Sequence, residues 1–327
     1  MTLLKDIPVG FLTNDVTFNQ DVKNLVPDDR IDGKYLAYSL TGSKHQILEL
    51  VTVAGHGTGK LETESLKSLP VSLPPLPEQI QIATILCTWD DALSILTHLI
   101  DIKRQQKRAL AEQLLTRKRR LKGFEGEWES VEIGAVLQQI KRPVDMVDDD
   151  SYEQLTVKRR SGGIVFRASL LGKETLTKKM NLAVDGDFLI SKMQVVHGAS
   201  ALIRARESGK FYSDSYVTLI PKKPSCVDMN YFEHLSSQSE MYDMYSRSSY
   251  GVHIEKMTFN IQLYLKEKIY LPGFSEQQAI ATVLSSLDTE IDLLTRQRVK
   301  VQEQKRGLMD LLLTGKVRAQ VPETDKF

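Results

Sequence analysis

Residues 73–97 read LPPLPEQIQIATILCTWDDALSILT, and residues 271–295 read LPGFSEQQAIATVLSSLDTEIDLLT. The match continues without a gap to Arg120 and Arg318, at a constant offset of 198, and 20 of the 48 paired residues are identical. A spacing of about 200 residues is far longer than the roughly 20–50 residues of a solenoid repeat. The chain is therefore a duplicated unit in which a globular part is followed by a helical part.

Each copy of the repeated segment predicts one long helix. Glu78 and Glu276 fall in the first turn, where the helix dipole favours an anion. No Gly or Pro interrupts residues 78–122 or 276–306. Apolar residues alternate at spacings of 4 and 3, which is a heptad seam, so two helices of about 40 residues are expected to pair with each other rather than lie separately on a globular core. The residues expected to pair are Ile82, Leu86, Trp89, Leu93, Leu96, Ile280, Leu284, Leu287, Ile291 and Leu294.

Two lysines, Lys107 and Lys305, occupy equivalent positions on the predicted seam. A basic residue in such a seam typically fixes the register of the helices at some cost in stability. Contact with a partner subunit is the alternative interpretation. The sequence favours the role in helix register.

The segment between the helices, residues 123–270, predicts a mixed α/β domain of about 150 residues. A hairpin is expected over 153–166, around the glycine turn at 161–163. One strand is expected after the turn at 185–187, and another ends at Pro221. Aromatic and apolar spacing predicts a helix over 229–245.

Residues 1–72 resemble the second half of the same domain. Residues 16–27 align with the strand segment that ends at Pro221, at an offset of 194, and residues 32–46 align with 228–242 at an offset of 196. No counterpart of residues 123–200 is present, so about 75 residues of the first globular unit are expected to be missing, which would leave strands unpaired and apolar surface exposed. A misassigned start codon, a truncated gene and a recombination cassette are the competing explanations.

Composition and charge limit the class of protein. With 43 Lys and Arg against 42 Asp and Glu, the net charge is +1, which excludes a polybasic protein but leaves binding to a specific DNA site open. Two cysteines are too few for a disulfide framework or a zinc site and indicate a reducing compartment. The N-terminus lacks a signal peptide, and no run of about 18 apolar residues could span a membrane. The sequence therefore predicts a soluble cytoplasmic protein.

Polar side chains suited to DNA gather in the predicted loops of the second domain. Arg, Lys, Gln and Ser are the residue types that reach base edges and phosphates. For each single residue the alternative is a solvated surface loop. The candidate DNA-binding residues are Lys158, Arg159, Arg160, Lys192, Gln194, His197, Ser213, Tyr216, His253 and Lys256.

Motifs for catalysis are missing. The run GHGTGK at 55–60 resembles a phosphate-binding loop, but Ala54 and Leu61 occupy positions where that motif needs Gly and Ser or Thr. Asp185, Asp187 and Lys192 lack the spacing of a nuclease metal site. The sequence therefore predicts neither a metal site nor a catalytic residue, which argues against a nuclease or methyltransferase in its own right.

The repeated LPPLPEQIQIATIL and LPGFSEQQAIATVL segments each lead into a long helix that ends QLLTRK or DLLLTGK. They resemble the conserved regions of the specificity subunits of type I restriction-modification systems. GDFLISKMQVVHGA and VTFNQDVKNLVP resemble segments of that family's target-recognition domains. The resemblance implies α/β (α+β) target-recognition domains joined by two long helices that form an antiparallel coiled coil.

The resemblance also implies partners. Each target-recognition domain would read half of a bipartite site in double-stranded DNA, and the helices would dock methyltransferase subunits and, through them, restriction subunits. S-adenosylmethionine, ATP and Mg²⁺ would be bound by those partners, with no cofactor in this chain. The chain is expected to be a non-catalytic specificity subunit; the alternative is a truncated, DNA-inactive scaffold or recombination-cassette relative that binds partners only through its helices.

The expected domain boundaries follow from the repeat and the resemblance together. They are a partial first target-recognition domain at 1–72, a first helical spacer at 73–122, a complete second target-recognition domain at 123–270, a second helical spacer at 271–320 and a tail at 321–327.

Overall fold

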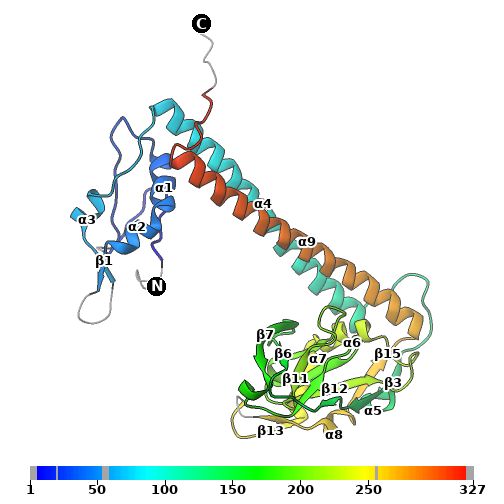
Figure 1. The fold of residues 1–327 in the computed structure, drawn as a ribbon. Helices are drawn as coiled ribbons and strands as arrows, with labels where there is room; N and C mark the ends of the chain where they lie inside the picture. Colours follow the sequence, from blue (N-terminus) through cyan, green and yellow to red (C-terminus); the bar gives the residue numbers. More distant parts are fainter. Residues whose placement is uncertain (1–5, 20, 54–58, 255–256, 322–327) are drawn as a thin grey trace. The chain divides into compact units, whose positions relative to one another are not determined.

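The computed structural model describes residues 6–19, 21–53, 59–254 and 257–321 (Figure 1). The chain forms two compact units, one made of residues 1–102 with 291–327 and the other of residues 103–290. Most of the GHGTGK run and the candidate Lys256 lie outside the described residues. Each unit contains one globular part and a portion of each long helix.

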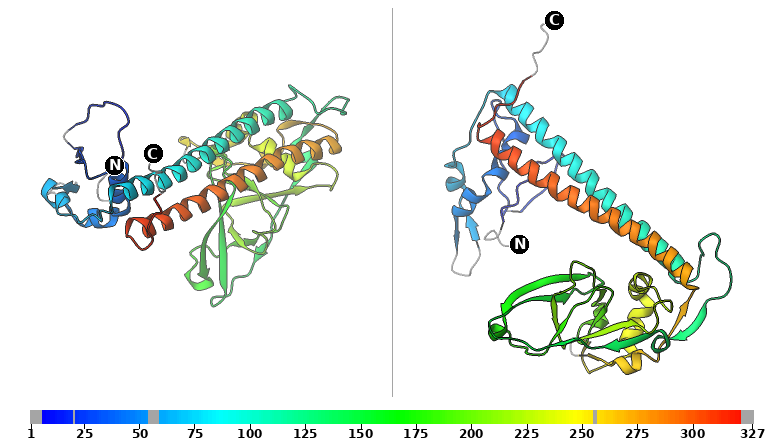
Figure 2. Two further views of the ribbon diagram at one scale, coloured as in Figure 1. Left: turned by 90° about the horizontal axis from the view of Figure 1, so that it is seen from above. Right: turned by 45° about the vertical axis from the view of Figure 1, so that its right-hand side comes forward.

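The two predicted helices are α4 (Leu76–Leu115) and α9 (Phe274–Leu313), each 40 residues long. In each unit the halves of α4 and α9 run side by side (Figures 1 and 2). The start of one helix meets the end of the other: Ile82 of α4 shares a core with Leu312 of α9, and Ile280 of α9 shares a core with Leu114 of α4. The helices are therefore antiparallel, as predicted. Among the described residues, no helix is both long and apolar enough to cross a membrane.

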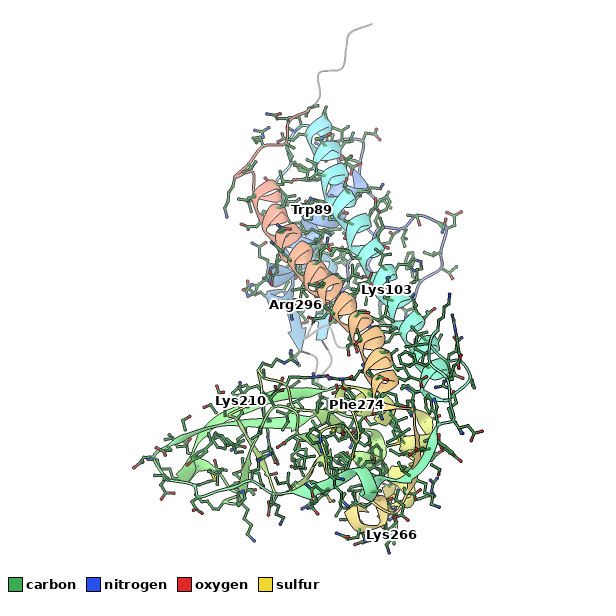
Figure 3. All side chains as sticks on the ribbon, turned by 90° about the vertical axis from the view of Figure 1, so that its right-hand side faces the viewer. Trp89, Lys103, Lys210, Lys266, Phe274 and Arg296 are labelled. Atoms are coloured by element: carbon green, nitrogen blue, oxygen red, sulfur yellow. The ribbon has the colours of Figure 1, made fainter. Side chains whose placement is uncertain are left out.

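The residues predicted to lie in the seam are all buried or half-buried. The most enclosed are Leu86, Ile280 and Leu284, at 0% exposure. Apart from Lys107 and Lys305, which occupy seam positions, charged side chains also lie on the outer faces of the helices; Arg296, for example, is exposed on α9 (Figure 3) and forms an ion pair with Asp292. The helix pair thus follows the heptad pattern read from the sequence.

Three layers make up the globular part of the second unit. A four-stranded antiparallel sheet lies in the middle, with two helices over one face and a five-stranded sheet over the other. The middle sheet is β10 (Ser200–Leu202), β9 (Phe188–Ser191), β12 (Tyr216–Pro221) and β4 (Leu137–Ile140); the helices are α6 (Met229–Ser236) and α7 (Ser239–Arg247); the outer sheet is β5 (Pro143–Val144), β8 (Met180–Leu182), β11 (Phe211–Ser213), β6 (Ser151–Val157) and β7 (Ile164–Leu171).

Strand β9 shows why this layering suits the sequence. Phe188 and Ile190 lie in the core shared with the helices, whereas Leu189 lies in the core between the two sheets. Because side chains alternate along a strand, a continuous apolar run is buried on both faces. The FLI run after the turn at 185–187 is therefore a central strand.

The single helix predicted over 229–245 is instead two helices, α6 and α7. The hydroxyls of Ser236 and Ser237 donate hydrogen bonds to the carbonyls of Glu233 and His234, both at 2.7 Å. Serine side chains that bond the local backbone compete with helix propagation. The aromatic spacing was interpreted correctly as helical, but the serine pair ends the first helix.

Smaller elements complete the second unit. Strand β3 (Glu129–Glu132) pairs with β15 (Lys268–Leu271), and β13 (Ser249–Tyr250) pairs with β14 (Thr258–Phe259). The remaining elements are the short helices α5 (Ile133–Val136) and α8 (Ile261–Tyr264) and the 3₁₀ helices η1 (Gly172–Glu174) and η2 (Val195–His197).

The globular part of the first unit repeats only the helical half of this arrangement. Helix α1 begins as α6 does: the carboxylate of Asp32 accepts a hydrogen bond from the amide of Tyr35 at 2.8 Å, and that of Asp228 accepts one from Tyr231 at 2.9 Å. Its elements are α1 (Gly33–Gly42), α2 (Lys44–Glu49), β1 (Val51–Val53), β2 (Gly59–Leu61) and α3 (Thr63–Lys67).

Residues 22–27, which match β12 in sequence at the offset of 194, form no strand. In the second unit β12 lies between β9 and β4, and both of these strands come from a segment without a matching sequence in residues 1–72. An isolated strand has no ladder to join. Large apolar side chains in this segment and in the residues before it are accordingly exposed: Phe11, Leu12, Val16, Phe18, Val22, Leu25 and Val26.

Candidate nucleic-acid interface

Four loops that carry the candidate residues meet at one end of the sheets of the second unit. The amide of Arg160, in the β6–β7 turn, donates to the carbonyl of His197 at 2.6 Å. The amide of Lys192 donates to the carbonyl of Ser215 at 2.9 Å, and the amide of Phe259 donates to the carbonyl of Lys192 at 2.8 Å. Residues that are far apart in the sequence therefore form one connected surface.

The β6–β7 turn supplies the cations of this surface. Lys158, Arg159 and Arg160 are all exposed. Within the described part of the chain, no ion pair holds the side chain of Lys158 or Arg160. The charge of these two residues is therefore available to an anionic partner.

Lys192 is tied into the surface more tightly than the sequence indicated. Its ammonium donates to the carbonyl of Asp214 at 2.5 Å, so it supports the turn between β11 and β12. Gln194 stands next to η2 with its side-chain oxygen buried, and no hydrogen-bond partner for that oxygen is present among the described residues.

Ser213 and Tyr216 flank the turn between β11 and β12. The Ser213 hydroxyl accepts a long hydrogen bond from the amide of Ser215 at 3.4 Å. The Tyr216 hydroxyl accepts one from the amide of Val157 at 3.2 Å and lies 3.1 Å from the Thr156 hydroxyl. Tyr216 therefore joins β12 to β6, and its hydroxyl is already engaged within the domain.

His253 lies on the loop between β13 and β14 and is exposed. Its neighbours Val252 and Ile254 are exposed at 95% and 57%. Strand β14, which follows this loop, lies beside the Lys192 segment, because the Thr258 hydroxyl contacts the sulfur of Met193 at 3.8 Å. Among the described residues no contact joins His253 itself to another candidate.

Lys179 also belongs to this surface, although it was not among the sequence candidates. It is exposed, and its carbonyl accepts a hydrogen bond from the amide of Asp214 at 3.1 Å. The lysine pair at 178–179 directly before strand β8 was the available signal. Its proximity to the other loops depends on the pairing of β8 with β11, which local sequence does not reveal.

Asp187, compared above with a nuclease metal site, instead holds an arginine. Asp187 is buried and accepts hydrogen bonds from the Arg142 guanidinium at 2.8 and 3.0 Å. No group of three His, Cys, Asp or Glu residues that could hold a metal ion occurs in the described part of the chain.

The Glu-Gln pair of each repeat explains why that motif recurs. The Gln79 side chain accepts from the amide of Asp32 at 2.9 Å and donates to the carbonyl of Pro74 at 2.8 Å. Gln277 accepts from the amide of Asp228 at 2.9 Å and donates to the carbonyl of Pro272 at 3.0 Å. Each glutamine thus attaches the start of a long helix to the helix of its globular part.

The glutamates close the opposite side of each junction. Buried Glu78 accepts hydrogen bonds from the Arg318 guanidinium, which lower the pKa of Glu78. Buried Glu276 accepts from Arg120 at 3.0 Å in the same way. In each unit, therefore, the segment that follows one long helix is fastened to the first turn of the other.

The seam lysines form two equivalent polar clusters. The Lys107 ammonium contacts the Asp288 carboxylate at 2.5 and 2.6 Å. The Lys305 ammonium contacts Asp90 at 2.5 Å. Each lysine is thus neutralised by the aspartate at the equivalent position of the other repeat, as expected for residues that set helix register.

A different residue completes each cluster. In the first unit the Tyr38 hydroxyl donates to Asp90 at 2.6 Å. In the second unit His234 takes the matching place, with Nε2 3.0 Å from the Ser285 hydroxyl and Nδ1 3.9 Å from Asp288. Burial, together with the nearby Lys107 cation, lowers the pKa of His234 to about 4. The imidazole is therefore neutral at pH 7, and its contact with Asp288 is not an ion pair.

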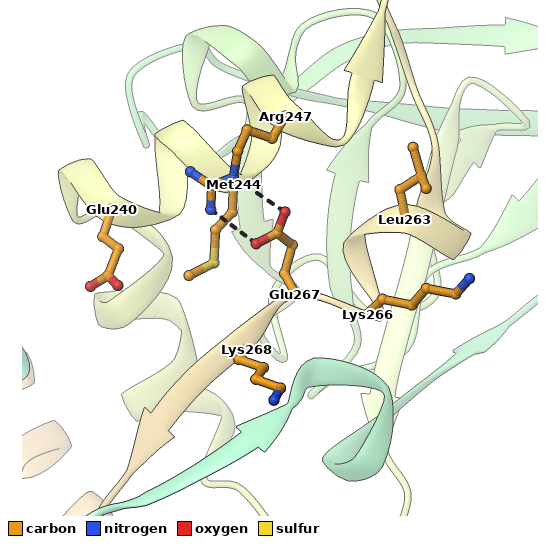
Figure 4. Close-up of a pocket in the computed structure, with 7 residues that line it drawn as sticks. All are labelled: Glu240, Met244, Arg247, Leu263, Lys266, Glu267 and Lys268. Atoms are coloured by element: carbon orange, nitrogen blue, oxygen red, sulfur yellow. Dashed lines mark hydrogen bonds and ion pairs between the residues drawn. The ribbon is translucent and has the colours of Figure 1, made fainter.

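Two hollows on the second unit are distinct in character. One is lined by polar groups that include Ser161, Lys107 and His234. The other lies beside α7 and α8, where an ion pair between Arg247 and Glu267 at 2.9 Å crosses it (Figure 4). None of the candidate DNA-binding residues lines this second hollow.

The fold defines a class of protein: a chain duplicated as a globular domain followed by a long helix, with the two helices paired antiparallel. A family model described as the type I restriction modification DNA specificity domain matches residues 5–104 and 125–303. The chain therefore belongs to this family. The resemblance seen in the repeated motifs is confirmed.

Two relatives named as specificity subunits match most of the chain. The type I restriction enzyme MjaVIII specificity subunit of Methanocaldococcus jannaschii is 26% identical over 318 residues, covering 90% of this chain and 72% of that protein. The putative MjaX specificity subunit of the same organism is 23% identical, covering 89% and 69%. These are named as specificity subunits, which confirms the prediction of a specificity subunit rather than an enzyme.

A solved structure shares the fold. The S subunit of a type I restriction-modification system from M. genitalium aligns with a TM-score of 0.58 at 15% identity, covering 88% of this chain and 74% of that one. This likeness supports the architecture of α/β domains and two long helices. The proposed domain boundaries and the truncation of the first domain stay predictions.

Proposed function

We propose that this chain is the DNA-recognition subunit of a type I restriction-modification complex. Its second globular domain would read one part of a bipartite site in double-stranded DNA. The observation that carries the proposal is the convergence of four loops, joined by backbone hydrogen bonds, that present exposed Lys158, Arg159, Arg160 and Lys179 on one surface. Cations contact phosphates, and Arg and Lys also read guanine in the major groove.

The near-neutral total charge is compatible with this role. Charges on the helices are balanced by local ion pairs; Lys103, which is labelled in Figure 3, pairs with Glu290 at 2.8 Å. Lys158, Arg160 and Lys179 of the loop surface are exposed. Binding would thus depend on a local basic surface rather than on the net charge.

We propose further that α4 docks a methyltransferase subunit, through which restriction subunits join. The supporting observation is an exposed apolar stripe outside the seam, formed by Ile95, Leu99 and Ile102 at 60%, 39% and 43% exposure. Their spacing of 4 and 3 places them on one helix face. Such a face is typical of a helix that binds a partner.

Both cysteines, Cys87 and Cys226, are free thiols, which fits a reducing, cytoplasmic site of action.

Arg160→Ala tests the DNA-reading role. Footprinting of the full chain together with its methyltransferase subunit should show a protected site, and the substitution should weaken binding about tenfold because one cationic contact is lost. Lys266→Ala is the matched control, since Lys266 is exposed in the same unit but lines the hollow of Figure 4. Lys192→Ala is less clean, because Lys192 also supports a turn.

The same experiment separates the alternative function. A DNA-inactive scaffold would bind the methyltransferase subunit and leave no protected site on any duplex. That result would overturn the DNA-reading proposal. Equal loss of binding in Arg160→Ala and Lys266→Ala would show that the loop surface is not the interface.

A further inference from the structure

The turn of the β6–β7 hairpin contains an unfavourable backbone conformation. Arg160 and Ser161 have φ angles of 58° and 50°, and the turn is closed by the amide of Gly162 on the carbonyl of Arg159 at 3.2 Å. Turns with two positive φ angles favour Gly, Asn and Asp. A residue with a larger side chain costs about 1–2 kcal/mol in this region.

Contacts from outside the hairpin hold this conformation in place. The amide of Arg160 donates to the carbonyl of His197 at 2.6 Å, and the amide of Ser161 donates to that of Gly198 at 2.8 Å. The Ser161 hydroxyl lies 3.0 Å from the hydroxyl of Tyr242, on helix α7. The turn is therefore fastened to the end of η2 and to α7.

Gly198 makes this three-way contact possible. Its φ angle is 71°, and a Cβ atom placed there would lie 2.0 Å from the Tyr242 hydroxyl. Only glycine lets the phenol approach the backbone so closely. Tyr242 consequently touches both the hairpin turn and the segment that follows η2.

The engaged backbone fixes where the side chains of the turn point. The amides of Arg160 and Ser161 bond to the carbonyls of His197 and Gly198, and the amide of Lys158 bonds to that of Gly163 within the hairpin. With the backbone held in this way, the side chains of Lys158 and Arg160 are exposed. A DNA-binding domain that distinguishes one base pair from another needs its contacting side chains held within a fraction of an ångström by the residues packed around them. Strain that is maintained by surrounding contacts is typical of functional sites.

We infer that Tyr242 is a positioning residue for DNA recognition, which sets the β6–β7 turn so that its cations discriminate between DNA sequences. The inference rests on the proposed function. Tyr242 need not touch DNA; it acts through Ser161 and Gly198. Its hydroxyl should therefore affect sequence discrimination more than affinity for arbitrary DNA.

Selection followed by two binding measurements tests the inference. The full chain is used to select from a pool of short duplexes with a randomised core, and dissociation constants are then measured for the enriched duplex and for a scrambled one. The discrimination ratio is the dissociation constant for the scrambled duplex divided by that for the enriched duplex. Tyr242→Phe should lower this ratio about fivefold, the equivalent of one lost hydrogen bond. The melting temperature and the affinity for scrambled DNA should stay close to those of the unmodified chain.

Two further variants separate positioning from stability. Ser161→Gly removes the same hydrogen bond but relieves the positive φ, so discrimination should fall as in Tyr242→Phe while the melting temperature is held or raised. Tyr270→Phe is the control, because Tyr270 lies on β15 and stacks on Arg117 with 3.7 Å between the guanidinium and the ring centre. It should leave the ratio unchanged.

The outcomes are distinct. If the parent chain enriches a sequence but the discrimination ratio is unchanged in Tyr242→Phe and Ser161→Gly, the inference is overturned and the proposed function stays intact. Equal losses on both duplexes together with a lower melting temperature would show a purely structural role and also overturn it. If the parent chain enriches no sequence, the proposed function fails and the inference fails with it.

Discussion

Gln277 is the residue on which the second junction depends most. Its amide group accepts from the backbone of Asp228 and donates to the buried carbonyl of Pro272. Truncating the side chain leaves two backbone groups without a partner, and a buried unsatisfied group costs about 1–3 kcal/mol.

Gln277→Ala should therefore lower the free energy of unfolding by about 2 kcal/mol, measured by urea denaturation of the full chain. Gln278→Ala is the matched control, since Gln278 is the next residue of α9 and is exposed. Gln79→Ala should produce a comparable loss through the equivalent contacts in the first unit. A loss in Gln278→Ala as large as that in Gln277→Ala would contradict this explanation.

His234 makes the stability of the second unit depend on pH. Its pKa is lowered from 6.5 to about 4 by burial and by the Lys107 cation, with Arg204 acting in the same direction and Asp288 opposing them. Between these two pH values the unfolded chain binds a proton that the folded chain does not. The free energy of unfolding should therefore fall as the pH is lowered from about 6.5 to about 4, by at most about 1.4 kcal/mol per pH unit.

Chemical denaturation across this pH range measures the effect. His234→Asn should flatten this part of the pH dependence, because the titrating group is removed. His253→Asn should leave the slope as it is, since His253 is exposed. An unchanged slope in His234→Asn would show that another group is responsible.

At the scale of the elements, we expect the seam ion pairs to set how α4 and α9 are aligned. Lys107→Asp would place a carboxylate opposite Asp288, so the melting temperature of the chain should fall. Because the Asp288 side chain is 46% exposed, the accompanying decrease in the free energy of unfolding should be modest, about 1 kcal/mol. The double variant Lys107→Asp with Asp288→Lys should recover most of it.

Arg108→Asp is the control for the seam substitution, because Arg108 is the exposed neighbour of Lys107 on α4. It reverses the same charge on the outer face of the helix. A double variant no more stable than Lys107→Asp would mean that the pair does not set the register.

The helices could be predicted from the sequence because their signals are local. Apolar spacing and the position of Pro74 and Glu78 are readable within one segment. The loop surface could be predicted only as a list of candidates: the contact of Arg160 with His197, and the engagement of Lys192 by Asp214, depend on strand pairings between distant residues. Residue type alone did not distinguish a surface cation from a cation that supports a turn.

The seam lysines show the same division between local and distant information. Their equivalent positions predicted a role in register. Their partners Asp90 and Asp288 became visible only once the helices were antiparallel, because each pair joins residues 215 or 181 positions apart. The place of Tyr38 and His234 beside them depends on the docking of a globular helix, which no local pattern contains.

At the scale of the whole molecule, the proposed docking stripe makes a prediction about assembly. Replacing Ile95, Leu99 and Ile102 together with serine should weaken copurification with the methyltransferase subunit at least about tenfold. Binding of the chain alone to DNA should be unaffected, because these residues lie outside the seam and the loop surface.

A second triple variant controls for the loss of apolar surface in general. Val147, Leu176 and Leu263 are exposed apolar residues of the other unit, and their replacement with serine should leave copurification unchanged. If both triple variants copurify as well as the parent chain, α4 does not carry the docking site.

The composition of the first unit has a consequence for the order of events during synthesis. Residues 1–102 form one compact unit with residues 291–327, and Glu78 is bonded by Arg318, which lies 240 positions later. At about 5–20 residues per second, translation of the intervening segment takes on the order of 10–50 s. The Glu78–Arg318 contact can therefore form only after nearly the whole chain has been synthesised, whereas the contact of Gln79 with Asp32 can form early.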